Sequence, residues 1–396
     1  MTPELQLLIG ACALARGLTP VPTLPIEPID LKELLDLAKR HKVLDALSPF
    51  FKTRPQLTTP DFMALLKKEL QAKAMHSTLI IEEWKNVTKN LEAEGFPVMS
   101  LKGPALSLQL YGKPNFREMR DLDFIVNTRN LHTLLPAMEK IGYDPEYFQS
   151  SYSAYQEKLF RKCVHHMEFR KSGHPVDVEI HSQTWKVTED SFPVTVAELF
   201  QHSQTLDWEG QTYRIPGEGY HFAYMLTHGS THAWCLLHWV LDFAVLWNQS
   251  DDKIFEEFLA VVKKYSLEGH FQVAHQIAGK FFLLTPRACV SPKDLEPTYE
   301  IKKFSSFCLS QFHEAGRKLT GLRGLKKNTF LFRLFSHKST FWNQIYRLII
   351  PNLNDINSVI LPNSLGFLYY FLRPCLFIYR LTIRILRIFH LTKQEV

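Results

Sequence analysis

Residues 101–126 read LKGPALSLQLYGKPNFREMRDLDFIV, and the last six of them combine charge with the pattern of a buried strand. Asp121 and Asp123 lie two residues apart within an otherwise apolar run. Side chains alternate between the two faces of a β-strand, so both carboxylates are expected on one face and the alternate apolar side chains on the other. Two carboxylates held side by side repel each other unless a positive charge lies close to them. The stretch therefore predicts a strand whose polar face holds a cation.

Two sources of that positive charge are open. Mg²⁺ binds one or two carboxylates and fills its remaining positions with water and phosphate oxygens. Alternatively, Arg117 and Arg120, which precede the strand, pair with the aspartates and form a salt bridge at the strand entrance. Taken alone, the Asp-x-Asp motif favours the salt bridge, because such short motifs occur often by chance.

A second acidic strand further along the chain favours the metal. The segment PVDVEIHS at 175–182 alternates in the same way and places Asp177, Glu179 and His181 on one face. A third carboxylate from a neighbouring strand would complete a two-metal phosphoryl-transfer site, in which the ions lie about 4 Å apart. Asp177 and Glu179 are both candidates for that ligand. His181 either orients Glu179 or reaches substrate, or it forms an ordinary hydrogen bond in the core.

Lys102 and Gly103 stand between a short predicted strand and a predicted helix that has Pro104 in its first turn. A glycine at such a turn lets a phosphate approach the backbone N–H groups at the start of the helix. The Lys102 ammonium would add a point charge to the same phosphate. The pair is therefore a candidate phosphate site.

The overall composition is that of a soluble protein. The chain has 396 residues, of which 45% are hydrophobic and 22% charged, and a formal net charge of +6. This charge favours anionic substrates or lipid headgroups but is too small to predict nucleic-acid binding. The N-terminal segment carries Glu4 where a secretory signal carries Lys or Arg, and no run reaches the roughly 18 apolar residues of a membrane-spanning helix. We therefore expect a cytoplasmic protein.

Hydrophobic periodicity divides the chain into four parts. Residues 1–95 are predicted to be helical, and residues 96–188 form an α/β core with four short strands. Residues 189–320 are a short hairpin followed by helices, and residues 321–396 are basic and aromatic, with an amphipathic terminal helix. The expected fold class is α+β, with a small mixed sheet bracketed by helical regions.

The order of these motifs resembles the nucleotidyltransferase superfamily that has a palm domain of the DNA polymerase β type. The shared elements are Lys-Gly before a helix, Asp-x-Asp on a strand, and a glutamate between apolar residues on a later strand. The stretches LKGPALSLQLYG, RDLDFIV and VEIH, with a His- and Trp-bearing helix that ends in Leu-Asp, look like the family of uncharacterised nucleotidyltransferases. The resemblance covers roughly residues 1–260 and implies the palm-like sheet described above.

The resemblance also implies roles for individual residues. Asp121, Asp123 and Glu179 would bind two Mg²⁺ ions and carry catalysis, with a nucleoside triphosphate as the donor substrate. Glu179 is preferred to Asp177 because it stands directly before Ile-His, as in the family pattern. The Lys-Gly pair at 102–103 stands where the superfamily has Gly-Ser, so the grip on the phosphate differs at that point.

The predicted reaction is the Mg²⁺-dependent transfer of a nucleoside monophosphate to an acceptor that the sequence does not identify, with release of pyrophosphate. Arg117, Arg120 and His181 are predicted to contact the triphosphate or another substrate anion. The alternative is a catalytically silent relative that serves as a binding or scaffold protein in a biosynthetic or cell-envelope pathway. A polymerase-like or RNA-modifying enzyme would need a broad basic groove, so no specific nucleic acid is expected.

Two further features leave alternatives open. His228 and His232 lie four residues apart on a predicted helix, with His238 and Asp242 after them. This spacing suits zinc, but the glutamate of a His-Glu-x-x-His site is missing, so histidines that form structural hydrogen bonds or line the substrate cleft are favoured.

The terminal helix is the second such feature. Arg373, Arg380, Arg384 and Arg387 recur near one stripe of this helix, and apolar residues cover the remainder. The pattern fits contact with a membrane surface, and it also fits docking on the protein body or on a second subunit.

Overall fold

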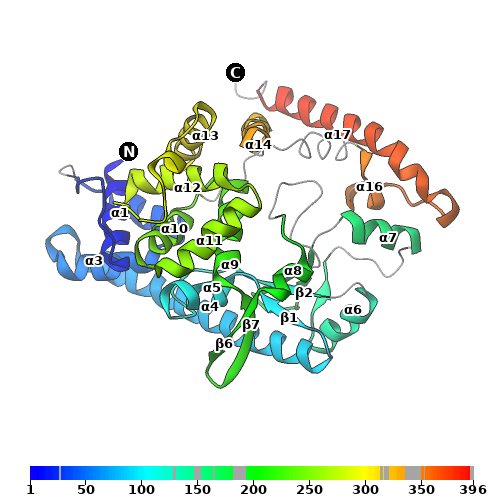
Figure 1. Cartoon of the computed structure of the whole chain (residues 1–396), viewed down its shortest axis with the longest axis horizontal. Coiled ribbons are helices and arrows are strands. Elements are labelled where there is room, and N and C mark those ends of the chain that lie inside the picture. Colours follow the sequence, from blue (N-terminus) through cyan, green and yellow to red (C-terminus); the bar gives the residue numbers. More distant parts are fainter. Residues whose placement is uncertain are drawn as a thin grey trace.

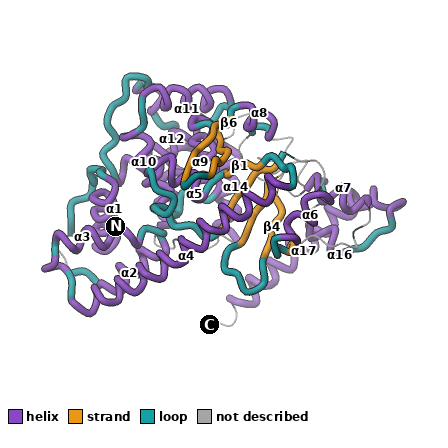
Figure 2. Tube along the Cα trace, turned by 90° about the horizontal axis from the view of Figure 1, so that it is seen from below, coloured by secondary structure: helices purple, strands orange, loops and turns teal. Residues whose placement is uncertain are grey.

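The computed structural model describes residues 1–25, 28–127, 131–146, 152, 154–163, 166–181, 193–312, 315, 321–334, 349–351 and 353–392. These residues form an α+β fold in which a small mixed sheet lies among helices, as the sequence predicts (Figure 1). Figure 2 shows the same arrangement along the Cα trace, with the few strands enclosed by helices.

Four α-helices and two short 3₁₀-helices precede the sheet: α1 (Pro3–Arg16), α2 (Leu31–Arg40), η1 (Leu44–Ala46), α3 (Leu47–Thr53), η2 (Pro55–Leu57) and α4 (Pro60–Ala93). Their starts follow the local sequence. The Asp30 carboxylate accepts the backbone N–H groups of Lys32 and Glu33 and so caps α2. The Thr59 hydroxyl accepts the backbone N–H of Phe62 and caps α4. The 34-residue α4 runs from the N-terminal helices to the sheet (Figure 1).

The main sheet has five strands: β1 (Val98–Ser100), β2 (Asp121–Val126), β3 (Asp144–Pro145), β4 (His166–Arg170) and β5 (Asp177–His181). Their order across the sheet is β1-β2-β5-β4-β3, and only β2 and β5 run parallel to each other. The four strands predicted from alternation thus correspond to β1, β2, β4 and β5. The parallel pairing brings the two acidic strands side by side in the sheet.

The two faces of the sheet have opposite character. Leu122, Phe124 and Val178 lie on the apolar face and pack in a core that includes Trp84 of α4. The other face carries the acidic side chains of β2 and β5. Ile125 shares that face and packs in the core of the helical part, so the polar face is turned toward the helices.

Short elements connect the strands of the main sheet or lead from β5 to the helices that follow it. They are α5 (Gly103–Tyr111), α6 (Leu131–Lys140), α7 (Ala154–Cys163), α8 (Val196–Gln201) and the hairpin β6 (Ser203–Trp208) and β7 (Gln211–Pro216). The hairpin is the one predicted within residues 189–320, and it packs on the apolar core of the sheet through Tyr213, whose ring stacks on Trp84 with 3.7 Å between ring centroids.

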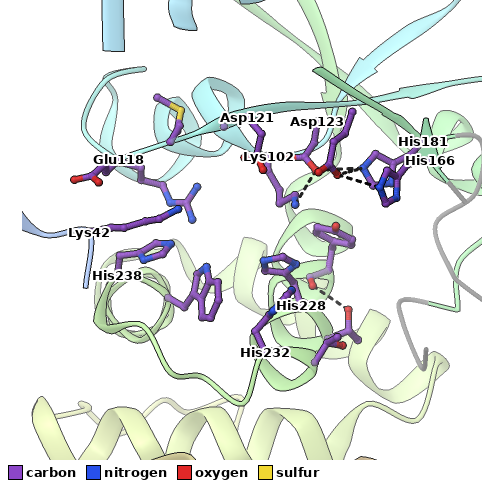
Figure 3. Close-up of a pocket in the computed structure, with 18 of the residues that line it drawn as sticks. Lys42, Lys102, Glu118, Asp121, Asp123, His166, His181, His228, His232 and His238 are labelled. Carbon is purple, nitrogen blue, oxygen red and sulfur yellow. Dashed lines mark hydrogen bonds and ion pairs between the residues drawn. The ribbon is translucent and has the colours of Figure 1, made fainter. Parts of the chain in front are cut away.

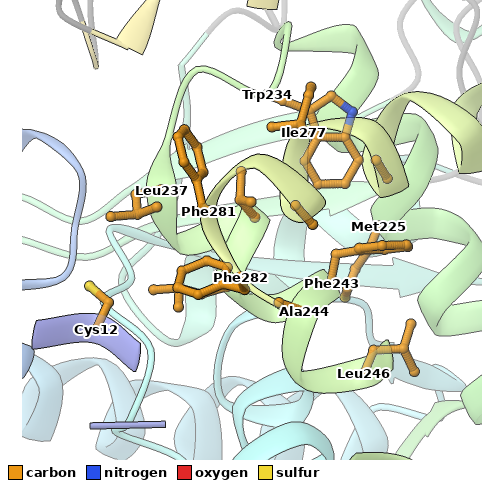
Figure 4. Close-up of a cluster of buried hydrophobic side chains, with 14 of the residues drawn as sticks. Cys12, Met225, Trp234, Leu237, Phe243, Ala244, Leu246, Ile277, Phe281 and Phe282 are labelled. Carbon is orange, nitrogen blue, oxygen red and sulfur yellow. The ribbon is translucent and has the colours of Figure 1, made fainter. Parts of the chain in front are cut away.

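The helices α9 (Glu218–Thr231), α10 (Leu237–Gln249), α11 (Asp252–Lys264), α12 (Glu268–Phe281), η3 (Pro292–Leu295) and α13 (Tyr299–Ser310) follow the hairpin. They share one core with α1–α3. Figure 4 shows Cys12 of α1 beside Phe281 and Phe282 at the end of α12. The predicted helical regions 1–95 and 189–320 therefore contribute to a single helical body that covers the polar face of the sheet.

The helix predicted around His228 and His232 is divided into α9 and α10. Ala233 and Trp234 adopt positive φ angles of 54° and 47°, which ends α9. The Trp234 ring lies against Gly229, where a Cβ atom would come within 2.6 Å of it. The expectation of one continuous helix was wrong, because the fit of Trp234 onto Gly229 turns the chain.

The C-terminal region adds α14 (Gly321–Leu334), α16 (Leu353–Ser358), η5 (Asn363–Leu368) and α17 (Tyr369–Thr392). Leu159 of α7, Ile356 and Tyr369 form a small separate core, and α16 and α17 lie beside α7 at the end of the molecule away from α1–α3 (Figure 1). Within the described residues, no helix is both long and apolar enough to cross a bilayer.

Arg373 and Arg380 of α17 both pair with the buried Asp355 of α16, the first at 3.3 Å. These two arginines thus take part in docking α17 on the protein. The side chains of Arg384 and Arg387 lie outside the described residues.

Candidate functional site

A cavity of about 530 Å³ lies between the polar face of the sheet and the helices α9 and α10 (Figure 3). Its walls come from segments far apart in the sequence. The lining residues are Lys42, Lys102, Gly103, Arg117, Glu118, Met119, Asp121, Asp123, His166, Glu168, Glu179, His181, Tyr224, Thr227, His228, Thr231, His232, His238 and Trp239.

The three carboxylates predicted from the sequence meet in this cavity. Asp123 and Glu179 are direct neighbours in the parallel pairing of β2 and β5, so their side chains leave the sheet side by side. Asp121 follows on the same face of β2. Asp177 is its neighbour on β5, but its side chain is 51% exposed, pairs with Arg170 and does not line the cavity. The geometry therefore favours Glu179 over Asp177 as the third carboxylate.

Asp123 is the most deeply buried of these groups and has two partners. Its Oδ1 atom lies 2.8 Å from Lys102 Nζ and 3.2 Å from His181 Nε2. Burial alone would raise the pKa of Asp123, but the Lys102 ammonium and the His181 hydrogen bond hold it well below its ordinary value. Burial would likewise lower the pKa of Lys102, but Asp123 raises it. Asp123 is therefore ionised and Lys102 charged at neutral pH.

Asp121 has a different electrostatic environment. Burial and the neighbouring Asp123 carboxylate raise its pKa. Lys42 approaches the same part of the cavity from the helical body, and Glu118 approaches it from the segment before β2 (Figure 3). Burial lowers the pKa of Lys42, although Asp121 and Glu118 partly oppose this effect. The Asp121 carboxylate, whose pKa is raised, and the Lys42 amine, whose pKa is lowered, therefore face each other across one end of the cavity.

At the other end, Glu179 lies among histidines. Its Oε2 atom is 3.5 Å from His181 Nε2 and 3.8 Å from His166 Nε2. Burial would lower the pKa of His181, but its hydrogen bonds with Asp123 and Glu179 raise it. Glu168 lies 3.3 Å from His166, and burial with the nearby Glu146 and Glu179 raises its pKa to about 7.

The strand-to-helix turn that was predicted as a candidate phosphate site lies at the start of α5. Gly103 is the first residue of the helix and has φ +60°, a conformation that other residues rarely adopt. The backbone N–H groups of the first turn are free of intrahelical partners in any α-helix, and here they lie beside the cavity that Gly103 lines.

The two arginines before β2 lie in different places. Arg117 is buried and binds Asp242 of α10 through Nε at 2.9 Å and Nη2 at 2.8 Å, and Asp242 also accepts the Tyr111 hydroxyl at 2.7 Å. Arg117 lines the cavity, whereas Arg120 is exposed and does not. The proposed salt bridge of Arg117 with the Asp-x-Asp motif is thus replaced by a bridge to Asp242.

The wall opposite the carboxylates is aromatic. The ring centroid of Trp239 lies 5.3 Å from those of His228 and His232 and 5.1 Å from that of His238. Burial lowers the pKa of His228 and of His238 well below the ordinary value, so both are neutral at physiological pH. This wall can therefore stack on a planar group and offer neutral nitrogen atoms for hydrogen bonds.

The model of a family described as "Uncharacterised nucleotidyltransferase" matches residues 27–282, which is well over half of the chain. The chain belongs to this uncharacterised nucleotidyltransferase family. A nucleotidyltransferase-like antigenic protein from Paracoccidioides brasiliensis is similar in structure at 16% identity, over 50% of this chain and 91% of that protein, with a TM-score of 0.27. No curated protein matches significantly.

Several lining residues of this nucleotidyltransferase family member are not predicted from the sequence. Lys42 lies in the N-terminal helical region, where no motif marks it. His166 and Glu168 alternate on a predicted strand, as do Asp121 and Asp123, so the same reasoning could have placed them on the polar face. The cleft interpretation of His228, His232 and His238 agrees with their positions in the cavity wall.

Proposed function

We propose that this protein is a nucleotidyltransferase that uses a divalent metal to transfer a nucleoside monophosphate from a nucleoside triphosphate to an acceptor hydroxyl or similar nucleophile. One observation carries the proposal. Three carboxylates from two parallel strands, Asp121, Asp123 and Glu179, converge in a cavity that also contains a helix N-terminus and the Lys102 ammonium. Membership in the uncharacterised nucleotidyltransferase family supports the same class of reaction.

The donor atoms fit Mg²⁺, because carboxylate oxygens are the hard ligands that this ion prefers. Asp121, Asp123 and Glu179 would hold it. When bound, the metal would neutralise the phosphates and align the attacking and leaving oxygens. Asp123 already carries its full negative charge under the influence of Lys102, which suits a metal ligand.

The remaining residues are assigned to substrate binding. The backbone at Gly103 and the Lys102 side chain would bind phosphate oxygens, and the aromatic wall around Trp239 would stack on the base or on the acceptor. The acceptor oxygen attacks the α-phosphorus, the bond from that phosphorus to the β-phosphate oxygen breaks, and pyrophosphate leaves. Glu179 is proposed to accept the acceptor proton. Arg117 and His181 are proposed to orient the substrate anion, and Arg120 remains a predicted contact outside the cavity lining.

The first test is nucleotide binding. Isothermal titration of ATP, GTP, CTP and UTP, each with Mg²⁺, compares the wild type with an Asp121→Asn/Asp123→Asn variant. An Asp36→Asn/Asp294→Asn variant is the matched control, because both of these aspartates are exposed and lie outside the cavity. We expect Mg²⁺-dependent binding of at least one nucleotide that is retained in the control and lost in the cavity variant.

Absence of nucleotide binding in the folded wild type would contradict the transferase. That result would favour the alternative function, a catalytically silent binding or scaffold protein in a biosynthetic or cell-envelope pathway. Circular dichroism of each variant shows whether the loss of binding reflects unfolding.

We also propose that the protein is cytoplasmic and that its C-terminal region contacts an anionic lipid surface. Residues 315–396 contain 13 Lys and Arg but 2 Asp and Glu, whereas residues 1–314 carry a formal net charge of −5. A basic region of this size attracts anionic lipids. The charge therefore supports a membrane surface as the proposed partner of this end of the molecule.

The exposed face of α17 supports this proposal. Phe371, Ile378 and Tyr379 are 71%, 62% and 64% exposed and lie on one side of the helix, opposite Arg373 and Arg380. In preceding segments, Ile360 is 81% exposed and Phe367 is 52% exposed. Apolar side chains of this kind can insert at the level of the headgroups.

Flotation of the full chain with phosphatidylcholine vesicles, with and without phosphatidylglycerol, tests the contact. We expect binding only to the anionic vesicles, and we expect salt to weaken it. Phe371→Ser/Ile378→Ser/Tyr379→Ser should reduce it at least about tenfold, since each apolar side chain contributes roughly 1 kcal/mol or more when it leaves water. The control is Leu65→Ser/Met75→Ser/Leu79→Ser, three exposed apolar residues of α4. Equal binding of both variants to the anionic vesicles would contradict the proposal. So would a wild type that binds no vesicles but forms a dimer that the α17 variant cannot form, because α17 would then dock on a second subunit.

A further inference from the structure

We infer that His166, Glu179 and His181 form a binding position for one divalent transition metal, such as Zn²⁺, Mn²⁺ or Co²⁺. One ligand atom from each of the three residues lies within 4.8 Å of the other two. The position is in the wall of the cavity described above. Its role in transfer rests on the proposed function, but metal binding itself is measured without a nucleotide.

The backbone fixes the three side chains on one face of the sheet. His166 and His181 are direct neighbours in the antiparallel pairing of β4 and β5, and Glu168 and Glu179 are the next pair on that face. Cross-strand neighbours have Cβ atoms about 5 Å apart, so their side chains can reach a common ion without any change in the backbone. Figure 3 shows the two imidazole rings side by side, next to Asp123.

The two distances from Glu179 to the histidines are close to those of a tetrahedral site. Zinc bonds of about 2.0–2.1 Å place two ligand atoms about 3.3 Å apart. The Glu179 Oε2 atom lies 3.5 Å from His181 Nε2 and 3.8 Å from His166 Nε2. Small rotations of the side chains would therefore bring these atoms onto one ion.

The ligand types select the class of metal. Imidazole nitrogen binds Zn²⁺, Co²⁺ and related ions well, whereas Mg²⁺ prefers oxygen ligands alone. Two histidines and one glutamate are the ligands of many catalytic zinc sites, which leave a further position open for water or substrate. Here that position would face the cavity. Asp121 and Asp123 offer only oxygens, so the two ends of the carboxylate cluster differ in the metal that they favour.

Cobalt is the probe, because its visible absorption reports its ligands. The full chain is freed of metal with a chelator and titrated with Co²⁺. We expect one tightly bound ion per chain with the strong visible bands of a nitrogen-containing site of low coordination number, and its displacement by Zn²⁺. Metal analysis by mass spectrometry gives the stoichiometry independently.

Variants at His166 test the ligand directly. His166→Gln should weaken Co²⁺ binding at least about tenfold, since even the loss of a residue that only orients a ligand has an effect of this size. His166→Cys should keep the metal and add a thiolate-to-cobalt charge-transfer band, which a purely structural role could not produce. His202→Gln, an exposed histidine outside the cavity lining, is the matched control.

Two results would overturn the inference. One is a Co²⁺ spectrum typical of oxygen ligands alone, and the other is His166→Gln binding Co²⁺ as tightly as the wild type. Asp121→Asn separates the two proposals, because it should abolish Mg²⁺-dependent nucleotide binding and leave the cobalt spectrum unchanged. Cobalt bound at His166 without any nucleotide binding by the wild type would refute the transferase and support the metal position.

Discussion

The bridge between Arg117 and Asp242 gives the sharpest prediction about how the two halves of the cavity are held together. Arg117 precedes β2, and Asp242 belongs to α10 in the helical body. Their side chains are 9% and 2% exposed. Asp242→Asn keeps the shape of the side chain and the oxygen that accepts the Tyr111 hydroxyl. It removes only the negative charge opposite the guanidinium.

We expect Asp242→Asn to lower the free energy of unfolding by about 3 kcal/mol. Removing one partner of a buried ion pair typically costs 3–5 kcal/mol, because the remaining charge is left without compensation. The lower end applies here, since Arg117 lines the cavity and can turn toward water. Urea unfolding followed by tryptophan fluorescence and circular dichroism measures the difference.

The control is Asp252→Asn, which removes the partner of Arg287 at a similar distance of 2.7 Å. Asp252 is 81% exposed, so its loss should cost less than about 1 kcal/mol. If the two variants lose the same stability, the bridge does not hold the sheet to the helical body. The pair also tests the substrate role of Arg117. Arg117→Met/Asp242→Leu should recover much of the lost stability, and weaker nucleotide binding by that folded variant would show that Arg117 contacts the nucleotide.

Three further perturbations follow from single residues. Gly103→Ala and Gly112→Ala should each lose about 1–2 kcal/mol of stability in urea unfolding, because both glycines have φ near +65°. Only Gly103→Ala should also weaken nucleotide binding in titration. If the two variants bind the nucleotide with equal affinity, Gly103 does not belong to a phosphate site. Burial lowers the pKa of His270 to about 3, below its value of about 6.5 in the unfolded chain. Titration of His270 therefore costs no stability above pH 6.5, and the free energy of unfolding falls as the pH drops from 6.5 toward 3. When the pH falls from 6 to 5, the free energy of unfolding of His270→Leu should therefore fall by about 1 kcal/mol less than that of the wild type. The exposed His202→Gln is the control, and an unchanged dependence of stability on pH in His270→Leu would contradict the prediction. Asp355→Asn should release Arg373 and Arg380 and increase hydrogen exchange in α17 while α9 keeps its protection, and unchanged exchange in α17 would show that the bridges do not dock this helix.

The acidic half of the site is predictable from the sequence because strand periodicity is a local property. Alternation alone places Asp121 with Asp123 and Glu179 with His181, and β2 begins and ends where the pattern predicts. The parallel pairing of these strands and its register cannot be predicted from the sequence of either strand alone. The preference for Glu179 over Asp177 came instead from the resemblance to nucleotidyltransferases, because Glu179 stands directly before Ile-His, and in the structure Glu179 is the direct neighbour of Asp123.

The aromatic half depends on tertiary packing and was only partly predictable. His228 and His232 attract notice through their spacing, but the turn at Ala233 and Trp234 follows from the fit of an indole ring onto Gly229. Lys42 enters the cavity from a segment without any motif, because the N-terminal helices share a core with the helices that follow the sheet. Partners such as Asp242 for Arg117 are likewise set by the fold, 125 residues away in the chain.

The charges of the assembled cavity lead to a further prediction, that nucleotide binding depends on a metal. Five of its lining residues are carboxylic acids, whereas its lining cations are two lysines and Arg117, whose charge Asp242 compensates. Burial, together with the neighbouring Asp123 carboxylate, raises the pKa of Asp121, which indicates the cost of this negative excess. A triphosphate is itself strongly anionic, so the empty cavity should repel it. Divalent cations at the carboxylates would reverse the sign of the field, and nucleotide affinity should therefore rise with metal concentration and disappear in a chelator.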